Sequence, residues 1–417
     1  MKFFLKFASL NYFLFVIILA AGCSNKKSNE LSNQDLIKPY PHYINLREGL
    51  ENQVQLKLSE IADSIRYVVL SKSKQILLKN IRNIQITDSN IYLISDNLVM
   101  RFDISGRFLN SFGGIGRGPQ EYLRGSIYTT TPEDDRIYIL RSALFSYLSF
   151  APNGNYRGVK DFPVPRTLFD FRYISDSVFL CTFYYIGNIM KEHIENSIDI
   201  LSGLYDLKGN QIKILDHPLK NSSLSPSETR NVISPAPLFT FFNNRAVLFP
   251  EGDTVYEVTS NSITKGFIIE WGSLPHKHTI EQLYLNETGS SSQISIFEPL
   301  LETSRKAFFR VKKSEEYCIF EYDKVTQSSR SMPVDFYNIG FINDLDGGKN
   351  YYPDWNNRRG DIWIAVEDAY SFKEHYTNEL LSNSDVTRSR NNEKLRVFCD
   401  NLEQDDNPVL KIVYLKK

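Results

Sequence analysis

A glycine-rich loop is the first place where residue types and spacing suggest chemistry. Residues 113–118, GGIGRG, contain Arg117 and lead into Pro119 and Glu121. Such loops bind phosphate through backbone amides, but this one matches neither GxGxxG nor GxxxxGK[ST] and does not lead into a helix. We expect its glycines to supply positive φ angles at a crossing between two sheets. Arg117 remains a candidate ligand-binding residue, either paired with Glu121 or facing a central pocket.

Two other groups of side chains have the composition of metal sites. His276 and His278 alternate along the chain with Glu281 nearby, but a zinc site needs further convergent ligands. The second group consists of three aspartates beside two glycines: Asp344, Asp346 and Asp354. It lacks the ligand spacing of a calcium loop. We interpret both groups as polar loops, and the sequence predicts neither a metal nor a cofactor.

Aromatic, amide and basic side chains crowd a third region. Tyr351, Tyr352 and Trp355 lie beside Asn356 and Arg358. Aromatic rings combine a large contact area with a polar edge, which suits a sugar or a peptide. The three aromatic residues are therefore candidate ligand-binding residues, with packing in a hydrophobic core as the alternative. No GxSxG, HExxH or paired-carboxylate motif stands out, so no catalytic residue is predicted.

The composition favours a β-rich protein with a large core. The 417 residues include 28 Phe and 24 Tyr, and short runs of β-branched and aromatic residues recur. A net charge of −1 gives no basic surplus, so we expect no nucleic-acid partner. Three cysteines lie in apolar contexts: Cys181, Cys318 and Cys399. We expect buried thiols there, with one disulfide as the alternative.

Six repeats of paired strands must position these side chains. The first three repeats each end in a turn with a glycine, at Gly106, Gly154 and Gly209. The Asn-Gly pair of the second turn is a strong hairpin signal. The repeats cover residues 91–112, 136–156, 177–210, 245–258, 306–322 and 361–415.

Repeats of about 40–50 residues, each made of four short strands, are typical of a β-propeller, because one such sheet cannot bury both of its faces alone. We predict an all-β fold, a six-bladed β-propeller over residues 41–417 with short helical insertions at about 277–305 and 367–403. An open ring would expose unpaired edge strands. We therefore expect the strand over residues 65–70 to share one blade with the strand over residues 409–415.

The N-terminus has the features of an export signal. Lys2 and Lys6 precede a mostly apolar run over residues 7–21. At about 15 residues, this run is shorter than the roughly 20 that cross a membrane. Small residues then lead into Cys23, and a polar tether rich in Ser, Asn and Lys follows. Because such a tether cannot bury apolar surface, we expect it to be flexible.

This segment resembles the signal peptide of a bacterial lipoprotein. The resemblance implies that residues 1–22 are removed, that Cys23 is lipidated and binds the membrane, and that residues 23–40 form the tether. Ser24, rather than Asp, follows the cysteine, and the tether lacks an acidic cluster. By the same resemblance, these features favour the periplasmic face of the outer membrane. The alternative is an ordinary secretory signal in which Cys23 has no role.

Four further stretches carry a wider resemblance. They are LSEIADSIRYVVL (58–70), FGGIGRGPQEY (112–122), GDTVYEV (252–258) and DDNPVLKIVYLK (405–416). Together with the lipoprotein start, they resemble the six-bladed β-propeller lipoproteins of Bacteroidetes, whose architecture is related to that of NHL-repeat propellers. The resemblance implies a propeller on a lipid anchor. That family has no settled activity, so no catalytic residues are transferred.

The function expected from these observations is non-enzymatic. We expect a lipid-anchored binding or scaffolding module at the cell envelope, with a glycan, peptide or protein as ligand. The alternative is a hydrolase or lyase with a polar site at the central channel, because the fold alone does not choose. An enzyme should bring carboxylate, His or Arg side chains together at the channel mouth. A binding module should show a broad aromatic or apolar patch.

Overall fold

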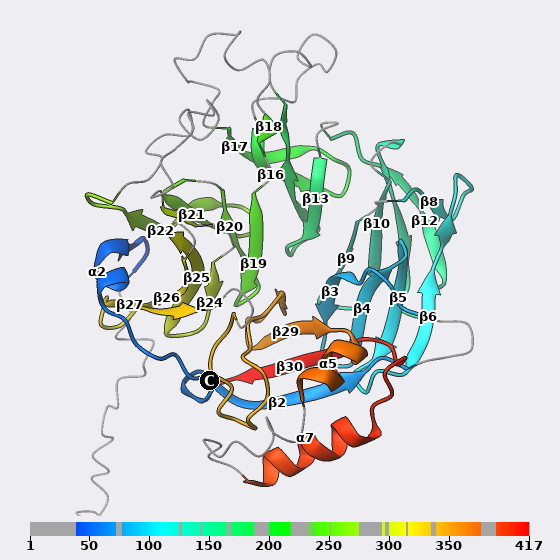
Figure 1. The fold of residues 1–417 in the computed structure, drawn as a ribbon. Coiled ribbons are helices and arrows are strands. Elements are labelled where there is room, and N and C mark those ends of the chain that lie inside the picture. The colour runs from blue at the N-terminus through cyan, green and yellow to red at the C-terminus, as the bar shows by residue number, and fades with distance from the viewer. Residues whose placement is uncertain are drawn as a thin grey trace, which may run out of the picture. The chain divides into compact units, whose positions relative to one another are not determined.

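Six small β-sheets stand in a ring in the computed structural model, which confirms the predicted six-bladed β-propeller (Figure 1). The structure describes residues 39–71, 77–124, 127–141, 144–164, 168–186, 200–217, 233–234, 237–250, 252–274, 294–296, 300–313, 316–334, 339–376 and 389–416. Cys23, the signal segment and the histidine pair at 276 and 278 lie outside these residues. Within them, no helix is long and apolar enough to cross a membrane.

In blades 1 to 3, the four strands pair antiparallel in chain order, and the first of them is the innermost. Blade 1 is β3 (Arg82–Ile86), β4 (Asn90–Ser95), β5 (Leu98–Asp103) and β6 (Phe108–Phe112). Blade 2 is β9 (Tyr128–Thr130), β10 (Ile137–Arg141), β11 (Ser146–Phe150) and β12 (Tyr156–Asp161). Blade 3 is β13 (Leu168–Tyr173), β14 (Val178–Phe183), β16 (Ile200–Asp206) and β17 (Gln211–Asp216).

In the second half of the ring, the strands do not all pair in chain order, because strands from the start of the chain join blades 4 and 6. Blade 4 is β19 (Leu238–Phe242), β20 (Arg245–Phe249), β21 (Thr254–Val258) and β22 (Ile263–Glu270). In blade 5, β23 (Ile294–Ile296) and β24 (Leu301–Glu302) both pair with β25 (Lys306–Lys313), followed by β26 (Glu316–Asp323) and β27 (Ser329–Val334). Blade 6 is β28 (Trp355–Asn356), β29 (Ile362–Glu367), β30 (Val409–Leu415) and β2 (Ala62–Val69).

Blade 6 closes the ring with strands from opposite ends of the chain. Strand β2 pairs antiparallel with β30, from Ala62 opposite Leu415 to Val69 opposite Val409. Both strands are largely apolar on the faces that pack between blades, and Val413 and Leu415 lie in a buried cluster. Because every blade then has neighbours on both sides, the expected closure between the two terminal strands is confirmed.

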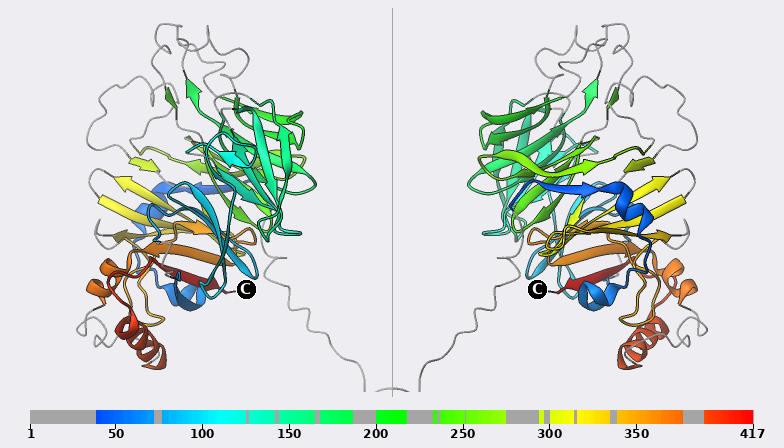
Figure 2. Two further views of the ribbon diagram at one scale, coloured as in Figure 1. Left: turned by 90° about the vertical axis from the view of Figure 1, so that its right-hand side faces the viewer. Right: turned by 90° about the vertical axis from the view of Figure 1, so that its left-hand side faces the viewer.

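The remaining elements lie outside the four-stranded scheme. They are β1 (His42–Asn45), β7 (Gly114–Ile115), β8 (Glu121–Tyr122), β15 (Tyr185–Ile186), β18 (Ile233–Ser234), α2 (Leu46–Glu51), the 3-10 helix η1 (Leu58–Glu60), α5 (Ala369–His375) and α7 (Ser389–Asn401). Helices α5 and α7 lie beside blade 6, in orange and red in Figure 2. Their apolar side chains pack against Tyr67 and Val69 of β2.

The two predicted helical insertions differ in outcome. The segment over residues 367–403 contains α5 and α7. In the segment over residues 277–305, the described parts include the strands β23 and β24, so this part is not helical. Both strands pair with β25, and a short apolar run suits a buried strand as well as a helix. The three cysteines are buried free thiols, as expected.

The glycine-rich loop is the crossing between blades 1 and 2, as predicted. It connects β6 to β9, and Gly113 has a φ of 61°. The Glu121 carboxylate accepts a hydrogen bond from the Gly118 amide at 2.7 Å, which closes the loop on itself. The Tyr122 hydroxyl is buried and donates to the Phe112 carbonyl at 3.0 Å. These contacts account for the loop as an architectural element.

An N-terminal belt, residues 39–61, crosses the outside of blades 4 and 5 before the chain enters blade 6. Strand β1 adds to blade 4 by parallel pairing with β22. The Val54 amide donates to Ser331 in blade 5 at 2.8 Å, and the Leu58 amide donates to Ile342 at 2.9 Å. The belt therefore joins three blades through backbone hydrogen bonds.

A buried group of charged and polar side chains, here called the belt cluster, fixes the start of this belt. Tyr40 donates to Glu302 at 2.5 Å, and Arg245 donates to both Glu302 carboxylate oxygens at 2.9 Å. Lys324 donates to the same carboxylate at 2.9 Å. The Glu302 side chain has no exposed surface. Because two cations and a hydroxyl surround one carboxylate, its charge is fully compensated.

Candidate functional site

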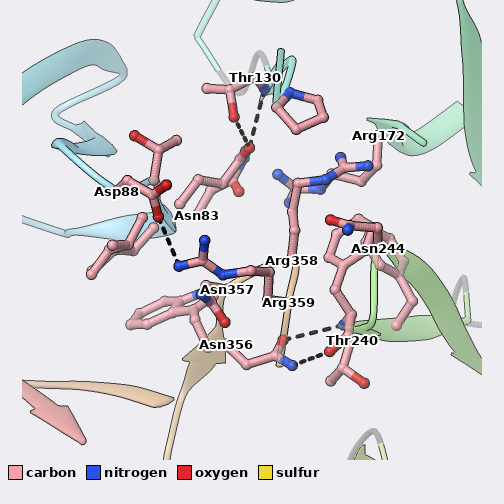
Figure 3. A pocket seen from close by; sticks show the side chains of 18 of the residues that line it. Asn83, Asp88, Thr130, Arg172, Thr240, Asn244, Asn356, Asn357, Arg358 and Arg359 are labelled. Carbon is pink, nitrogen blue, oxygen red and sulfur yellow. Dashed lines mark hydrogen bonds and ion pairs between the residues drawn. The ribbon is translucent and has the colours of Figure 1, made fainter. Parts of the chain in front are cut away.

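A cavity of about 320 Å³ opens along the central channel, and we call it the channel pocket. Innermost strands and the turns that follow them supply its walls, from blades 1, 2, 3, 4 and 6 (Figure 3). The walls combine aromatic rings with polar groups. The side chains that matter most for its chemistry are Gln85, Arg172, Phe241, Trp355, Asn356 and Arg358.

Arg172 projects from β13 in blade 3. Its guanidinium pairs with Asp170 at 3.1 Å and donates to the Tyr128 carbonyl at 3.1 Å. Its carbon Cζ lies 5.5 Å from the centre of the Phe239 ring. The side chain is 12% exposed, so these contacts are made largely out of water. They fix the guanidinium in one position against the wall of the pocket.

Arg358 reaches the same pocket from the turn after β28 in blade 6. Its guanidinium donates to the Tyr173 and Ile174 carbonyls at the end of β13, and lies 4.8 Å from the centre of the Phe241 ring. No carboxylate among the described residues lies within ion-pair distance of it. Burial lowers the pKa of Arg358 to about 10. The group is therefore a poorly compensated buried cation.

The Nε–H groups of these two arginines are unsatisfied. Both are buried, and neither has a hydrogen-bond partner in the described part of the chain. A buried donor without a partner is costly, which makes it a natural place for a ligand acceptor. Arg172 and Arg358 also lie close enough for their positive charges to repel each other, which helps to lower the pKa of Arg358 (Figure 3). An anion between them would relieve both costs.

The turn that carries Arg358 is held firmly across the channel. The Asn244 amide of blade 4 donates to the Arg358 carbonyl at 3.0 Å. Gly360 follows with a φ of 73°, and a Cβ there would lie 2.7 Å from the Phe242 ring. Only glycine satisfies both the left-handed backbone and the close approach. The guanidinium is thus positioned by the backbone of two blades.

Side-chain amides replace strand pairing in the pocket wall. Gln85 donates to the Tyr128 carbonyl at 3.1 Å and accepts from the Thr130 amide at 3.1 Å. Asn356 accepts from the Phe241 amide at 3.2 Å and donates to the Phe241 carbonyl. Each amide thus pairs with a neighbouring inner strand as a backbone group would. This satisfies inner-strand edges that would otherwise be unpaired.

The mouth of the pocket carries the acidic side chains. Arg359 pairs with Asp88 at 2.7 Å, and both side chains are at least half exposed. Asp354 accepts a hydrogen bond from the Val366 amide at 3.0 Å. The described lining contains no histidine. Its two carboxylates are therefore both engaged, which leaves the two inner arginines as the dominant charges.

The aromatic candidates from the sequence separate into different environments. Trp355 lines the channel pocket. Tyr351 is 1% exposed in a hydrophobic cluster, and its hydroxyl donates to the Lys411 carbonyl at 3.4 Å. Tyr352 is packed between blades, and Arg310 lies 4.7 Å from its ring centre. The structure therefore brings Trp355 together with Asn356 and Arg358, but places the two tyrosines in the core.

The other candidates lie away from the pocket. Arg117 is exposed on the blade 1–2 crossing. Asp344 accepts from the Ser59 amide at 2.9 Å, and Asp346 accepts from the Tyr67 hydroxyl at 2.9 Å. Among the described residues, no group of three potential ligands could hold a metal ion. The aspartates act as hydrogen-bond acceptors that fix the belt and β2 to the loop before blade 6.

Sequence reasoning did not find Arg172 or Gln85. Both lie on innermost strands, and neither belongs to a motif. The available signal was a polar side chain inside a run that is otherwise apolar, as in LFDFRY of β13. In a buried strand, such a side chain needs a partner or a ligand.

The fold and the site together define a β-propeller with a cationic pocket in its channel. The chain belongs to the family described as a domain of unknown function, DUF4934, whose model matches residues 41–414. No curated protein matches the chain.

Two of the solved structures that are similar to it come from Bacteroides species. A protein from Bacteroides fragilis described as exported has 18% identity and a TM-score of 0.64, covering 90% of this chain and 99% of its own. A member of the DUF4221 family from Bacteroides vulgatus has 12% identity and a TM-score of 0.45, covering 88% and 98% respectively. At 18% identity, the likeness to the first of these structures shows the fold alone.

Proposed function

We propose that this propeller is a non-enzymatic binding module whose channel pocket holds the anionic group of a glycan or peptide ligand. The observation that carries the proposal is the pair of guanidiniums of Arg172 and Arg358, which line one cavity and each have a buried Nε–H without a hydrogen-bond partner among the described residues. A carboxylate placed there accepts charge-assisted hydrogen bonds, which are about twice as strong as neutral ones. Trp355 supplies an apolar surface beside it for the rest of the ligand.

A hydrolase or lyase is less well supported by the same pocket. The convergence of arginines at the channel is one feature expected of an enzyme. General acid–base chemistry also requires a group that can take up a proton. Among the described lining residues, Asp88 is paired with Arg359, which leaves Asp354, whose pKa is raised by burial, as the single carboxylate that could take up a proton. We therefore favour binding without turnover.

Titration calorimetry with glucuronate and glucose tests this proposal. The sugars differ in one carboxylate, so we expect glucuronate to bind at least tenfold more tightly. Arg358→Gln should remove that preference, because it removes a buried cation. Arg157→Gln, on the exposed outer strand β12, is the matched control and should retain it. Equal affinity for both sugars in the wild-type protein, repeated with a peptide acid and its amide, would reject an anion site.

We also propose that the protein is exported and anchored to the outer membrane, facing the periplasm, through lipid on Cys23. The N-terminal sequence supports this, and a structurally similar protein is described as exported. Cys23→Ala should move the protein from the membrane fraction to the soluble fraction of the envelope. Unchanged fractionation of this variant would argue against lipidation.

A further inference from the structure

A second cavity continues the channel beyond the channel pocket. Its volume is about 360 Å³, and we call it the second chamber. The two cavities share Asn83 and Arg172 in their walls. Along β3, Arg82 lines only the second chamber and Gln85 lines only the channel pocket. The cavities therefore follow one another along the innermost strands, with Arg172 at their boundary.

The second chamber differs in chemistry from the channel pocket. Its one carboxylate, Asp170, is already paired with Arg172. Most of the other lining side chains are apolar or aromatic: Ile94, Ile127, Leu140, Leu168, Phe169 and Tyr184. The rings of Phe169 and Tyr184 meet edge to face with centres 4.7 Å apart, and Tyr184 is 37% exposed. The remaining lining residues are polar or charged, Arg82, Asn83 and Arg172, so the chamber offers apolar contact beside the ion pair of Arg172 and Asp170.

Backbone irregularities mark the same chamber. The pairing of β3 shifts register between Arg82 and Gln85, and Asn83 there has a φ of 53°. The pairing of β13 shifts between Leu168 and Asp170. Bulges redirect side chains and are common beside functional sites. The two innermost strands that line the chamber, β3 and β13, are thus both distorted where they face it.

We propose that the channel binds an anionic amphiphile, with its carboxylate between Arg172 and Arg358 and its apolar part in the second chamber. This inference rests on the proposed anion site and adds the class of ligand. The carboxylate satisfies the unsatisfied Nε–H groups. The apolar part covers Phe169 and Tyr184 and removes their exposed surface from water.

Titration calorimetry with butanoate, octanoate and octanamide tests the proposal. Octanoate should bind more tightly than butanoate, by about threefold to fourfold for each methylene that enters the second chamber. Octanamide, which has the chain without the charge, should bind at least tenfold more weakly than octanoate. The double variant Phe169→Ser/Tyr184→Ser should lose the dependence on chain length and keep the affinity for butanoate. Tyr370→Ser, an exposed tyrosine on α5, is the matched control.

The outcomes separate the two proposals. If butanoate and octanoate bind equally and both depend on Arg358, the anion site stands and the amphiphile inference is wrong. If octanamide binds as tightly as octanoate and Arg358→Gln changes neither, both proposals are wrong. If the double variant unfolds, Tyr184→Phe combined with Phe169→Leu retains the packing. An unchanged dependence on chain length is then expected, and its loss would count against apolar contact as the cause.

Discussion

The belt cluster and the channel pocket both bury arginine side chains, but they compensate the charge differently. Arg245 in the belt cluster contacts two carboxylates, Glu302 at 2.9 Å and Glu257 at 2.8 Å. Arg358 in the channel contacts carbonyl groups and an aromatic ring. Burial lowers the pKa of both guanidiniums, but the carboxylates outweigh it at Arg245, whose pKa is raised. Two carboxylates compensate Arg245, although its Nη1 also lacks a hydrogen-bond partner among the described residues, whereas no described carboxylate is in ion-pair contact with Arg358.

The charges of the belt cluster stabilise the fold, whereas those of the channel pocket are the ones that we propose to bind a ligand. In the belt cluster, burial alone would raise the pKa of Glu302, but Lys324 and Arg245 keep that pKa below its usual value. Each polar partner there lies on a different element, so the cluster joins β1 to blades 4 and 5. In the channel, Arg358 links blade 6 to blade 3 by donating to the backbone carbonyls of Tyr173 and Ile174. The Nε–H groups of Arg172 and Arg358 thus have no acceptor among the described residues.

The largest expected effect is from Glu302→Gln. This change leaves Arg245 and Lys324 buried without their shared carboxylate, so it should lower the free energy of unfolding by about 3–5 kcal/mol. Urea unfolding followed by fluorescence measures it. Glu51→Gln, at an exposed pair with Arg47, is the control and should have little effect. A loss below about 1 kcal/mol for Glu302→Gln would mean that the cluster does not hold the belt.

The next effect is a dependence on pH from His42. Its ring is fully buried against Phe267 and Tyr322, close to Lys324, and burial lowers its pKa from 6.5 to about 4. Between these values the unfolded chain binds a proton that the folded protein excludes. Stability is therefore complete above about pH 6.5 and falls as the pH drops to 4, by about 3 kcal/mol.

His42→Phe isolates this contribution. The variant keeps an aromatic ring beside Phe267 but cannot take up a proton. Urea unfolding of the two proteins at several pH values should give a difference that grows below pH 6.5. Parallel stability profiles for the two proteins would show that His42 does not titrate as its burial implies.

A smaller loss of stability is expected from Arg358→Gln. The change leaves at least one of the Tyr173 and Ile174 carbonyls without a donor, which costs about 1–3 kcal/mol. It also removes a buried cation that the Glu133 carboxylate compensates only from beyond ion-pair distance, which offsets part of the cost. Thermal unfolding should therefore show a smaller shift than for Glu302→Gln. A larger shift would mean that Arg358 is mainly a structural link between blades 3 and 6.

The smallest effect belongs to the mouth of the pocket. Asp88→Asn removes the exposed ion pair with Arg359, and it should change the free energy of unfolding by less than about 1 kcal/mol. The difference should shrink further in 1 M NaCl, because salt screens exposed charges. If the change in unfolding free energy persists in 1 M NaCl, the Asp88–Arg359 pair is shielded from solvent as the buried clusters are.

The regular middle strands of each blade could be predicted from the sequence. Strands such as β4 and β5 are short, mostly apolar runs joined by a tight turn, and the expected pairs β4–β5, β10–β11 and β14–β16 are present. The closing pair β2 and β30 followed from the need to cover edges. The path of β1 could not be predicted, because its partner β22 is over 200 residues away and its register depends on the belt cluster.

The innermost strands were not predicted, and they carry the site. Strands β24 and β28 have two residues each, and β9 has three. Runs this short have no detectable period, and their polar side chains replace part of the usual pairing. The cluster around Trp355 and Arg358 was noticed through its composition, but Arg172 depends on a three-dimensional arrangement across blades. Tyr351 and Trp355 are only four positions apart, but Tyr351 is buried in a hydrophobic cluster and Trp355 lines the channel pocket.

The belt also determines how the molecule would bear a mechanical load. Tension applied at residue 39 enters at β1, where the ladder to β22 and the Tyr40–Glu302 hydrogen bond resist it together. Only after these break, and the bonds to Ser331 and Ile342 follow, would the load reach β2 in the closing blade. Resistance to pulling depends on the rate of unfolding rather than on equilibrium stability. The contacts of the belt would thus break before the β2–β30 pair that closes the ring.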